Sequence, residues 1–460
     1  MNARLRADGG ALRRGAGRRA GLLAAAGSAL ALAAVAACSS GGGGGSASGT
    51  QNGFKPAAQT GGTLTVWVDS TRLAAAQLYQ KQNPKVKMKI VTYDGDANGS
   101  NYLQTKVSLF NRTRGGWPDV VFSAENNEVT WAVPAGFAAP LNKGLIAQAT
   151  LDGWASGANA PCTVDGTIYC LRNDLSQTVL WYNEKLMKQW GYQVPTTWEQ
   201  YQALGQKVAT EHPGYLVGDA GDTFTPEIYL WAAKCGANQI TGAKAVTVNT
   251  TSSNCTKMAG LLDTLIKNKT ISISSVFSSD FDKKEPGKIL MLPGPAWYGG
   301  ALFQGTFKTA AGQIAVAPMP QWAGDTSPSV GNVGGGTWLL SAHSANLKAA
   351  TAFLTWVTTA DDYQGKLAPG YPAYSAAAKT WLAGQAASGY YANDIAAPLQ
   401  AAANQVWPGW GYGQFSQEAI WAATVTPGLN AGKSLVSLLP AWQSAIENYA
   451  RSDGYQVATS

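Results

Sequence analysis

The chain is rich in tryptophan and poor in charged side chains. All 17 of its tryptophans lie after residue 37, and only 13% of its residues are charged. Aromatic faces pack against rings that carry many C–H groups, and amides and carboxylates exchange hydrogen bonds with hydroxyls. This composition predicts a neutral, hydroxyl-rich ligand, of which a saccharide is the simplest example.

Three polar residues directly follow strand-like segments and are candidate contacts for such a ligand. Asp69 follows the apolar run 64–68, and Glu125 and Asn126 come shortly after the run 119–122. In a sheet of parallel strands the carboxyl ends meet at one edge, where ligands bind. We expect the three side chains to bond ligand hydroxyls; the alternative for each is an exposed loop residue.

Aromatic residues of the second half are candidates for stacking on a sugar ring. Trp410 and Tyr412 alternate with glycine in the segment 407–413, and glycine is unfavourable in helices and strands alike. The segment is therefore predicted to be a loop that displays its rings. Gly335 and Gly336 either bring backbone amides close to the ligand or permit a crossing between sheets. The aromatic candidates are Trp231, Trp297, Tyr298, Trp410 and Tyr412.

Four of the five cysteines follow residue 38, an even number that suits an oxidising compartment. They permit three pairings, of which we favour Cys162 with Cys170 and Cys235 with Cys255. The first pair brackets a predicted hairpin with a three-residue bulged turn centred on Gly166. Zinc is the competing interpretation, but the chain has no C-x-x-C motif and only two histidines.

The N-terminus has the parts of a bacterial secretion signal. Arginines precede an uncharged run that ends at Ala37, and residues 35–38 resemble a lipobox, which predicts removal of 1–37 and lipidation of Cys38. The alternative, an uncut transmembrane span, is disfavoured because the run is alanine-rich and short for a hydrocarbon core of ~30 Å. Residues 38–60, rich in glycine and serine, are a predicted tether.

Most of the positive charge belongs to this signal. The whole chain has a formal net charge of +7, but residues 1–37 carry six arginines and one aspartate, which leaves about +2 for the remainder. No basic stripe with interleaved aromatics follows, so nucleic-acid binding has no support. About 400 remaining residues exceed one typical core, and we expect two lobes.

Strand-like and helix-like segments alternate after the tether. Residues 62–68, 86–91 and 119–122 are predicted strands, and 74–82 and 102–111 are predicted helices. This order predicts an α/β fold whose first lobe is doubly wound around a largely parallel sheet.

Further short segments, in a shared order and spacing, carry a resemblance to a known family. The chain resembles the extracellular solute-binding lipoproteins of bacterial ABC importers, in the sugar-binding family that includes maltose-binding protein. The resemblance covers nearly all of residues 60–450. Its landmarks are 64–67, 117–122, 164–169, 173–174, 179–186, 195–199, 294–297, 314–320 and 334–336.

The resemblance implies a periplasmic-binding-protein-like fold with discontinuous lobes and a ligand cleft between them. The first lobe would take 60–173 and 320–365, and the second would take 177–318 and 370–460. The crossovers that join the lobes would act as the hinge. The hinge candidates are 174–177, 317–321 and 365–370.

The resemblance also implies a function, namely capture of a neutral mono- or oligosaccharide outside the cytoplasm and delivery to the transmembrane subunits of an ABC permease. Trp297 and Trp410 match regions where family members present stacking aromatics. Asp174 matches the acidic residue often found on the first crossover, where its alternative role is to brace the hinge. The protein would be a lipid-anchored monomer without a cofactor or metal and would not be an enzyme.

Three other functions remain open on the residues alone, and one of them is a passive surface adhesin. The same fold could bind another solute, such as an amino acid, a peptide, a polyamine or a metal ion. An extracellular glycoside hydrolase would need two carboxylates flanking a bond, and any two of Asp69, Glu125, Asp174 and Asp222 could meet in space.

Overall fold

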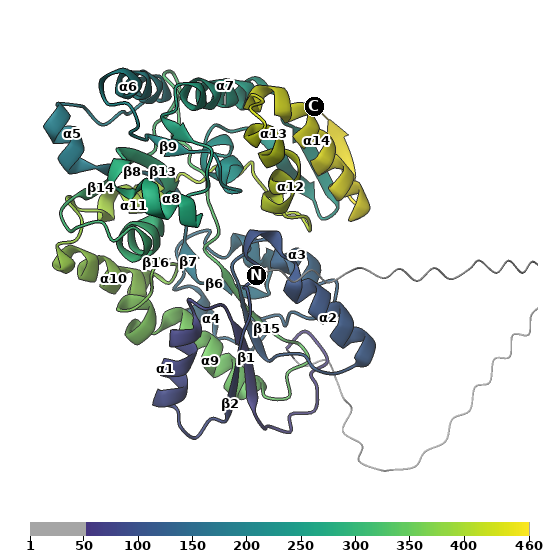
Figure 1. Ribbon diagram of the computed structural model, residues 1–460. Coiled ribbons are helices and arrows are strands. Elements are labelled where there is room, and N and C mark those ends of the chain that lie inside the picture. Colours follow the sequence, from purple (N-terminus) through teal and green to yellow (C-terminus); the bar gives the residue numbers. More distant parts are fainter. Residues whose placement is uncertain (1–51, 460) are drawn as a thin grey trace, which may run out of the picture. The chain divides into compact units, whose positions relative to one another are not determined.

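The computed structural model describes residues 52–459, which form two lobes, each built on its own β-sheet (Figure 1). The predicted signal 1–37, the lipidation site Cys38 and the tether up to residue 51 lie outside the described residues. None of the helices within 52–459 is both long and apolar enough to cross a bilayer.

The first lobe is built on a five-stranded sheet that is parallel except for one strand. β1 pairs in parallel with β2 and β3, while β15 runs antiparallel between β3 and β6. The prediction of a largely parallel sheet is therefore confirmed. The strands, in spatial order, are β2 (Met88–Thr92), β1 (Leu64–Val68), β3 (Val120–Ser123), β15 (Thr337–Leu340) and β6 (Cys170–Arg172).

Helices cover both faces of this sheet because its strands are apolar on both sides. Val66 packs with α1 and α9, whereas its neighbour Trp67 points to the opposite face and packs with α2 and α3. Figure 1 shows α1 and α9 on one side of β1 and α2 on the other. The helical segments are α1 (Leu73–Gln82), η1 (Ala97–Gly99), α2 (Tyr102–Thr113), α3 (Glu128–Ala132), α4 (Gln148–Leu151), η2 (Ala160–Cys162), α9 (Leu347–Thr359) and η6 (Asp361–Gly365).

The second lobe is centred on β8 (Thr178–Asn183), whose six residues are all buried. β13 (Met291–Pro295) and β14 (Ile314–Ala317) flank it, both antiparallel. Beyond β13 the chain continues the layer through a bridge between Leu216 and Ile289 to the short pair β9 (Gly218–Asp219) and β12 (Ile271–Ser272). A separate sheet contains β10 (Gly236–Gly242), β11 (Ala245–Asn249) and β17 (Gln456–Thr459).

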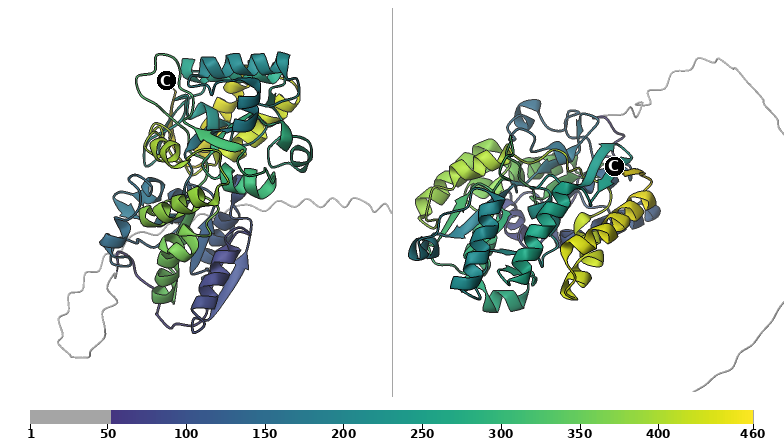
Figure 2. Two further views of the ribbon diagram at one scale, coloured as in Figure 1. Left: turned by 90° about the vertical axis from the view of Figure 1, so that its left-hand side faces the viewer. Right: turned by 90° about the horizontal axis from the view of Figure 1, so that it is seen from above.

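Helices from distant parts of the chain surround these strands, as the two views of Figure 2 show. Trp442 on the last helix packs edge-on against Trp421, which closes the core at the C-terminal end. The helical segments are α5 (Glu184–Trp190), α6 (Trp198–Glu211), η3 (Pro226–Leu230), α7 (Ser253–Lys267), α8 (Ser279–Lys284), η4 (Pro286–Lys288), η5 (Tyr298–Thr306), α10 (Ser375–Ser388), α11 (Ala396–Ala403), α12 (Gln417–Thr424), α13 (Thr426–Asn430) and α14 (Leu435–Ser452).

The second passage of the chain between the lobes lies later than the sequence predicted. Residues 317–321 were a hinge candidate, yet Gln321 bonds Thr196 and Ser329 bonds Ala232, both in the second lobe. Val330 and Val333 also pack in the second core. The chain crosses only at 334–336, where three consecutive glycines adopt positive φ angles that other residues avoid.

The first and third passages lie side by side. β7 (Asp174–Leu175) pairs antiparallel with β16 (Tyr371–Pro372), so the segments near 174 and 371 form a two-stranded connection between the lobes. This pairing places Asp174 at the base of the space between them.

Both favoured disulfides are confirmed: Cys162 is bonded to Cys170, and Cys235 to Cys255. The predicted three-residue turn of the first hairpin is wrong. β4 (Thr163–Val164) and β5 (Thr167–Ile168) are joined by two residues, Asp165 and Gly166, both with positive φ. That geometry is a two-residue Asp-Gly turn. The cysteines are therefore offset by one residue rather than directly opposed, at a Cα–Cα distance of 4.9 Å.

Candidate functional site

A cleft of about 580 Å³ lies between the two lobes, and both contribute to its walls. The first lobe supplies strand-end loops after β1 and β3, and the second supplies the loops after β9 and β13 and the start of α12. Its principal lining residues are Arg72, Glu125, Asp174, Asp222, Phe224, Phe277, Trp297, Gly335, Gly336 and Glu418.

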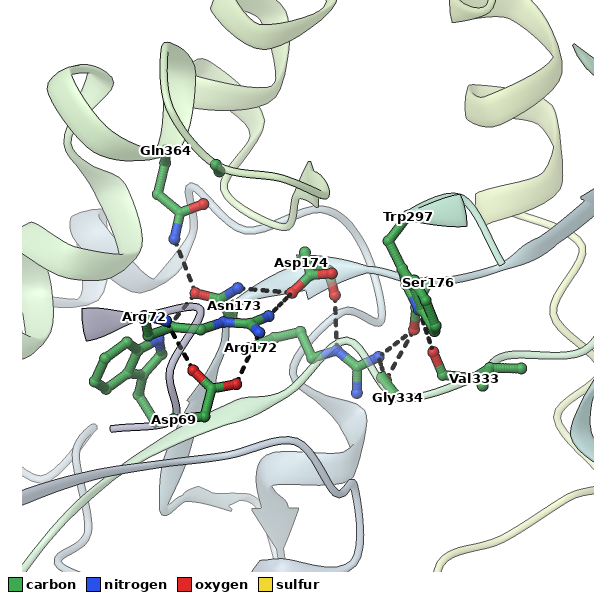
Figure 3. Close-up of polar contacts among 12 residues, drawn as sticks. Asp69, Arg72, Arg172, Asn173, Asp174, Ser176, Trp297, Val333, Gly334 and Gln364 are labelled. Carbon is green, nitrogen blue, oxygen red and sulfur yellow. Dashed lines mark hydrogen bonds and ion pairs between the residues drawn. The ribbon is translucent and has the colours of Figure 1, made fainter. Parts of the chain in front are cut away.

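At the base of the cleft Arg72 lies between two carboxylates (Figure 3). Its Nη1 is 3.1 Å from Oδ2 of Asp69, and its Nη2 is 3.5 Å from Oδ1 of Asp174. Asp69 also accepts a hydrogen bond from the backbone N–H of Arg72, so it fixes the first residues after β1. The guanidinium lies 4.2 Å from the ring centre of Phe122. We call Asp69, Arg72 and Asp174 the Arg72 triad.

Burial and charge act in opposite directions on the triad. Burial alone lowers the pKa of Arg72, but the carboxylates of Asp69 and Asp174 outweigh it, so the pKa is raised. Burial raises the pKa of Asp174 above its ordinary value, and Arg72 and the amide of Asn173 offset part of that rise. The ion pair is therefore the interaction that permits a carboxylate at this depth.

A second arginine, Arg172, holds the segment 334–336, where the chain crosses between the lobes for the second time. It donates to the backbone oxygens of Asp174 and Gly334, to the hydroxyl of Ser176 and to the side chain of Asn126. A Cβ at Gly335 would lie 2.2 Å from the guanidinium. Gly335 is thus required for the close approach, and its neighbour Gly336 lies against Phe122 in the same way. Gly335 and Gly336 were predicted either to bring backbone amides close to the ligand or to permit a crossing between sheets. These contacts favour the crossing.

The far wall of the cleft is aromatic. The Trp297 ring lies 5.9 Å from Phe277 at an interplanar angle of 30°, and Phe224 meets Trp297 edge-on at 6.2 Å. The Trp297 indole donates to the backbone oxygen of Val333, at 3.0 Å, which fixes the ring (Figure 3). Phe277 is 47% exposed, an unusual position for a large apolar ring, and this exposed surface is available to a ligand.

Near the cleft three buried glutamates from different elements come together. Glu125 follows β3 of the first lobe, Glu227 lies on the π-helical segment η3, and Glu418 lies in the first turn of α12. The Glu418 carboxyl shares hydrogen bonds with both of the others. All three are at least 91% buried. We call them the glutamate group.

The carboxyls of the glutamate group lie against one another, whereas those of the Arg72 triad lie against a cation. Burial raises the pKa of Glu125 and of Glu227 well above the ordinary value, and the Glu418 charge raises both further. Burial also raises the pKa of Glu418. The pKa values of all three carboxyls are therefore raised together, because carboxyls in contact cannot all ionise without a cation.

Only some of the residues predicted to bind ligand line the cleft. Glu125, Asp174, Trp297, Gly335 and Gly336 line the cleft. Asp69 does not line it and acts through Arg72 instead. Asn126 bonds Gly334 and lies in a small side cavity with the glutamate group.

The remaining predicted aromatics are packed rather than displayed. Trp231 and Tyr298 are each 1% exposed, and Trp410 is 4% exposed and stacks on Trp231 at 5.2 Å. The segment 407–413 is indeed a loop, but its ring at Trp410 faces the core. With Tyr412, Trp231 and Trp410 line a different cavity, of about 510 Å³, beside Arg172.

Sequence reasoning missed several residues of the cleft. Phe224 and Phe277 lie in loops without periodicity, Glu227 of the side cavity lies on the π-helical segment η3, and Glu418 lies in the first turn of α12, so no apolar pattern marked them. Asp222 follows the short strand β9 and was considered only as one of several carboxylates that a hydrolase could use. Glu418 had a local signal, since Ser416 caps α12 by accepting from the Ala419 N–H.

Comparisons with known proteins identify the fold independently. Residues 62–364 match the family described as bacterial extracellular solute-binding protein. A search of curated protein sequences found no significant match to this chain.

Solved structures of low sequence identity share the fold. An ABC transporter associated binding protein from Bifidobacterium animalis subsp. lactis, in complex with β-1,6-galactobiose, is 20% identical with a TM-score of 0.72, over 86% of this chain and 100% of that one. The galacto-N-biose-/lacto-N-biose I-binding protein from Bifidobacterium longum is 18% identical with a TM-score of 0.68, over 86% and 99%. The cyclic α-maltosyl-1,6-maltose binding protein from Arthrobacter globiformis is 19% identical with a TM-score of 0.64, over 85% and 100%.

The two-lobed architecture, the cleft between the lobes and the match over 62–364 agree. The chain belongs to the bacterial extracellular solute-binding protein family.

Proposed function

We propose that the protein is the substrate-binding component of an ABC sugar importer, which captures a saccharide between its lobes and delivers it to a membrane permease. The observation that carries this proposal is the construction of the cleft. One wall presents the rings of Trp297, Phe224 and Phe277, and the other presents side chains that bond hydroxyls, among them Asp174 and Glu125. A sugar ring has an apolar face and a hydroxyl rim that suit these two walls.

The binding cycle follows from the connections between the lobes. Three passages of chain join them, near 174, 335 and 371, and contacts across the opposite rim, such as Thr130 to Gly413, close the space. A ligand that touches both walls stabilises the closed arrangement, which the permease would then recognise.

We also propose that the protein acts as a lipid-anchored monomer outside the cytoplasm. Lipidation of Cys38 would hold the protein at the outer face of the membrane through the tether 38–60, and a monomer suffices because one chain supplies both walls. The protein would have no catalytic role.

A thermal-shift screen of the purified protein tests the proposal. Mono- and oligosaccharides are compared with amino acids, peptides, polyamines and iron. A ligand at one hundred times its dissociation constant adds about 2.7 kcal/mol to the free energy of unfolding, which raises Tm by several degrees at most. A shift with saccharides supports the proposal, a shift only with other solutes contradicts it, and turnover of saccharide in the same wells would indicate a hydrolase.

A further inference from the structure

The side cavity next to the glutamate group has hydrogen-bonding capacity that the protein itself does not meet. Within residues 52–459, both polar atoms of the Gln417 amide and Oδ1 of Asn238 have no hydrogen-bond partner. These side chains are 95% and 97% buried, and they line the cavity together with Glu125, Glu227 and Glu418. Buried polar atoms are rarely left without partners, so the site calls for an occupant.

The cavity admits only a small occupant and adjoins the cleft. The cavity has a volume of about 20 Å³, which admits one non-hydrogen atom with its hydrogens. Glu125 and Glu418 line both the cavity and the main cleft. A single substituent on a cleft-bound ligand therefore fits.

The charges around the cavity favour a cation. Glu128 faces Glu125, Asp222 faces both Glu227 and Glu418, and Arg172 faces Glu227. Arg172 is the one cation among these groups, and its donors are already used by Asn126, Ser176 and the backbone. In the described part of the chain no group of three or more His, Cys, Asp and Glu side chains is arranged to hold a metal ion.

We propose that the ligand carries a primary ammonium group, which enters the side cavity and donates its hydrogen bonds to the glutamate group. This inference rests on the proposed function and narrows it to an amino-substituted saccharide, whose ring lies against Trp297 and whose ammonium reaches the carboxyls. An ammonium has three donors and no acceptor, which matches the carboxyls and the unpartnered oxygens of Asn238 and Gln417, whereas Nε2 of Gln417 is a donor that the ammonium does not satisfy. The ammonium charge would lower the raised pKa values of these carboxyls, so we expect binding to release protons to solvent.

Isothermal titration calorimetry of the purified protein with matched probes tests this inference. Each series pairs an amino sugar with the two neutral sugars that carry a hydroxyl or an N-acetyl group in its place. The first series is glucosamine with glucose and N-acetylglucosamine, and the second is galactosamine with galactose and N-acetylgalactosamine. The third is the β-1,4-linked glucosamine disaccharide with cellobiose and N,N′-diacetylchitobiose. Putrescine and spermidine supply ammonium groups without a sugar ring. We expect the amino member of at least one series to bind at least tenfold more tightly than both neutral partners. Its heat should vary with the ionisation enthalpy of the buffer, because protons are released.

Two variants show whether the glutamate group is the site. Glu227→Gln and Glu418→Gln should each weaken binding of the amino member at least tenfold and that of its neutral partners less than threefold. Glutamine resembles a protonated carboxyl, so both variants are expected to fold, and Tm measurement checks this. Glu211→Gln, at the exposed end of α6, is the control and should change nothing.

The outcomes separate the inference from the function on which it rests. Neutral sugars that bind as tightly as their amino partners in every series would overturn the ammonium site and leave the sugar-binding function in place. Binding of putrescine or spermidine alone would support the ammonium site and overturn the saccharide. If no probe binds, both are overturned.

Discussion

The Arg72 triad and the glutamate group are two ways of placing carboxyls between the same two lobes. In the triad, Asp69 and Asp174 share the guanidinium of Arg72. In the glutamate group three carboxyls meet, and the nearest cation, Arg172, is occupied elsewhere. The first arrangement is complete in the protein itself, whereas the second needs protons or a ligand.

The two regions differ in how their buried charge is balanced. A charge-balanced buried set holds one geometry, because losing either sign leaves the other buried and unpaired. A set of like-charged groups changes its protonation with its surroundings and so responds to whatever enters the cleft. Asp174 lies on the passage β7, and Glu125 and Glu418 each lie five residues from the rim contact between Thr130 and Gly413.

Breaking the triad should have the largest effect. Arg72→Met leaves Asp69 and Asp174 without their cation, and Asp174 is 4% exposed, so we expect a loss of about 3 to 5 kcal/mol in the free energy of unfolding. Denaturant unfolding at pH 7 measures it. Arg112→Met, on the exposed face of α2, is the matched control and should stay within about 0.5 kcal/mol. A loss below 1 kcal/mol for Arg72→Met would show that the triad is not a brace.

Raising the pH should destabilise the protein through the carboxyls that lack a cation. Burial, with a contribution from Asp96, raises the pKa of Glu128 to about 8, and burial raises that of Asp96 to about 6. The folded chain binds more protons than the unfolded chain between the ordinary carboxyl pKa and these values. The free energy of unfolding should therefore fall, by on the order of a few kcal/mol, as the pH rises from 5 to 9.

Calorimetric Tm values across that pH range measure this dependence. Glu128→Gln should flatten it, because the amide cannot ionise, and Glu211→Gln should leave it unchanged. A Tm that rises with pH would mean that the buried carboxyls are ionised and paired in the folded protein.

Removing the aromatic wall should reduce affinity more than stability. Trp297→Ala should weaken saccharide binding by about 1 to 3 kcal/mol, on the scale of a lost aromatic contact, with little loss of folding. Titration calorimetry and Tm together measure both effects, with Tyr449→Ala on the exposed surface of α14 as the control. Unchanged affinity with a large drop in Tm would place Trp297 in the core, as the structure places Trp410.

Neutralising one member of the glutamate group should have the smallest effect on folding. Glu418→Gln replaces a carboxyl that shares hydrogen bonds with two other carboxyls by an amide of the same shape, so the free energy of unfolding at pH 6 should change by about 1 kcal/mol or less. Urea unfolding measures it beside Arg72→Met. A loss as large as that of Arg72→Met would show that Glu418 is ionised and paired, and the contrast between the two regions would disappear.

Local patterns were sufficient for the elements of the first lobe. The alternating and apolar runs predicted strands close to Leu64–Val68, Met88–Thr92 and Val120–Ser123. The helical spacing of apolar residues in the segments that join these strands predicted α1 and α2. The same strand-end argument led to Glu125. The disulfide pairing was also predictable, because the cysteines of each pair are close in sequence.

The sequence misled once through a local assumption and twice where the deciding contact came from a distant segment. The turn at Asp165 and Gly166 was predicted one residue too long, because direct opposition of the cysteines was assumed. The passage near 334–336 was placed too early, because only the bonds of Gln321 and Ser329 to the second lobe show where 320–333 belongs. Trp231 and Trp410 looked displayed in sequence and instead stack on one another across 179 residues.

The sequence by itself determined the α/β class and the two-lobed family, since these follow from periodicity and ordered short motifs, and it predicted an export signal and a hydroxyl-rich ligand. Only the tertiary structure decided which side chains face the cleft and what state they are in. Burial and the pKa of a carboxyl depend on neighbours brought together by folding, as when Glu125, Glu227 and Glu418 meet from three separate elements.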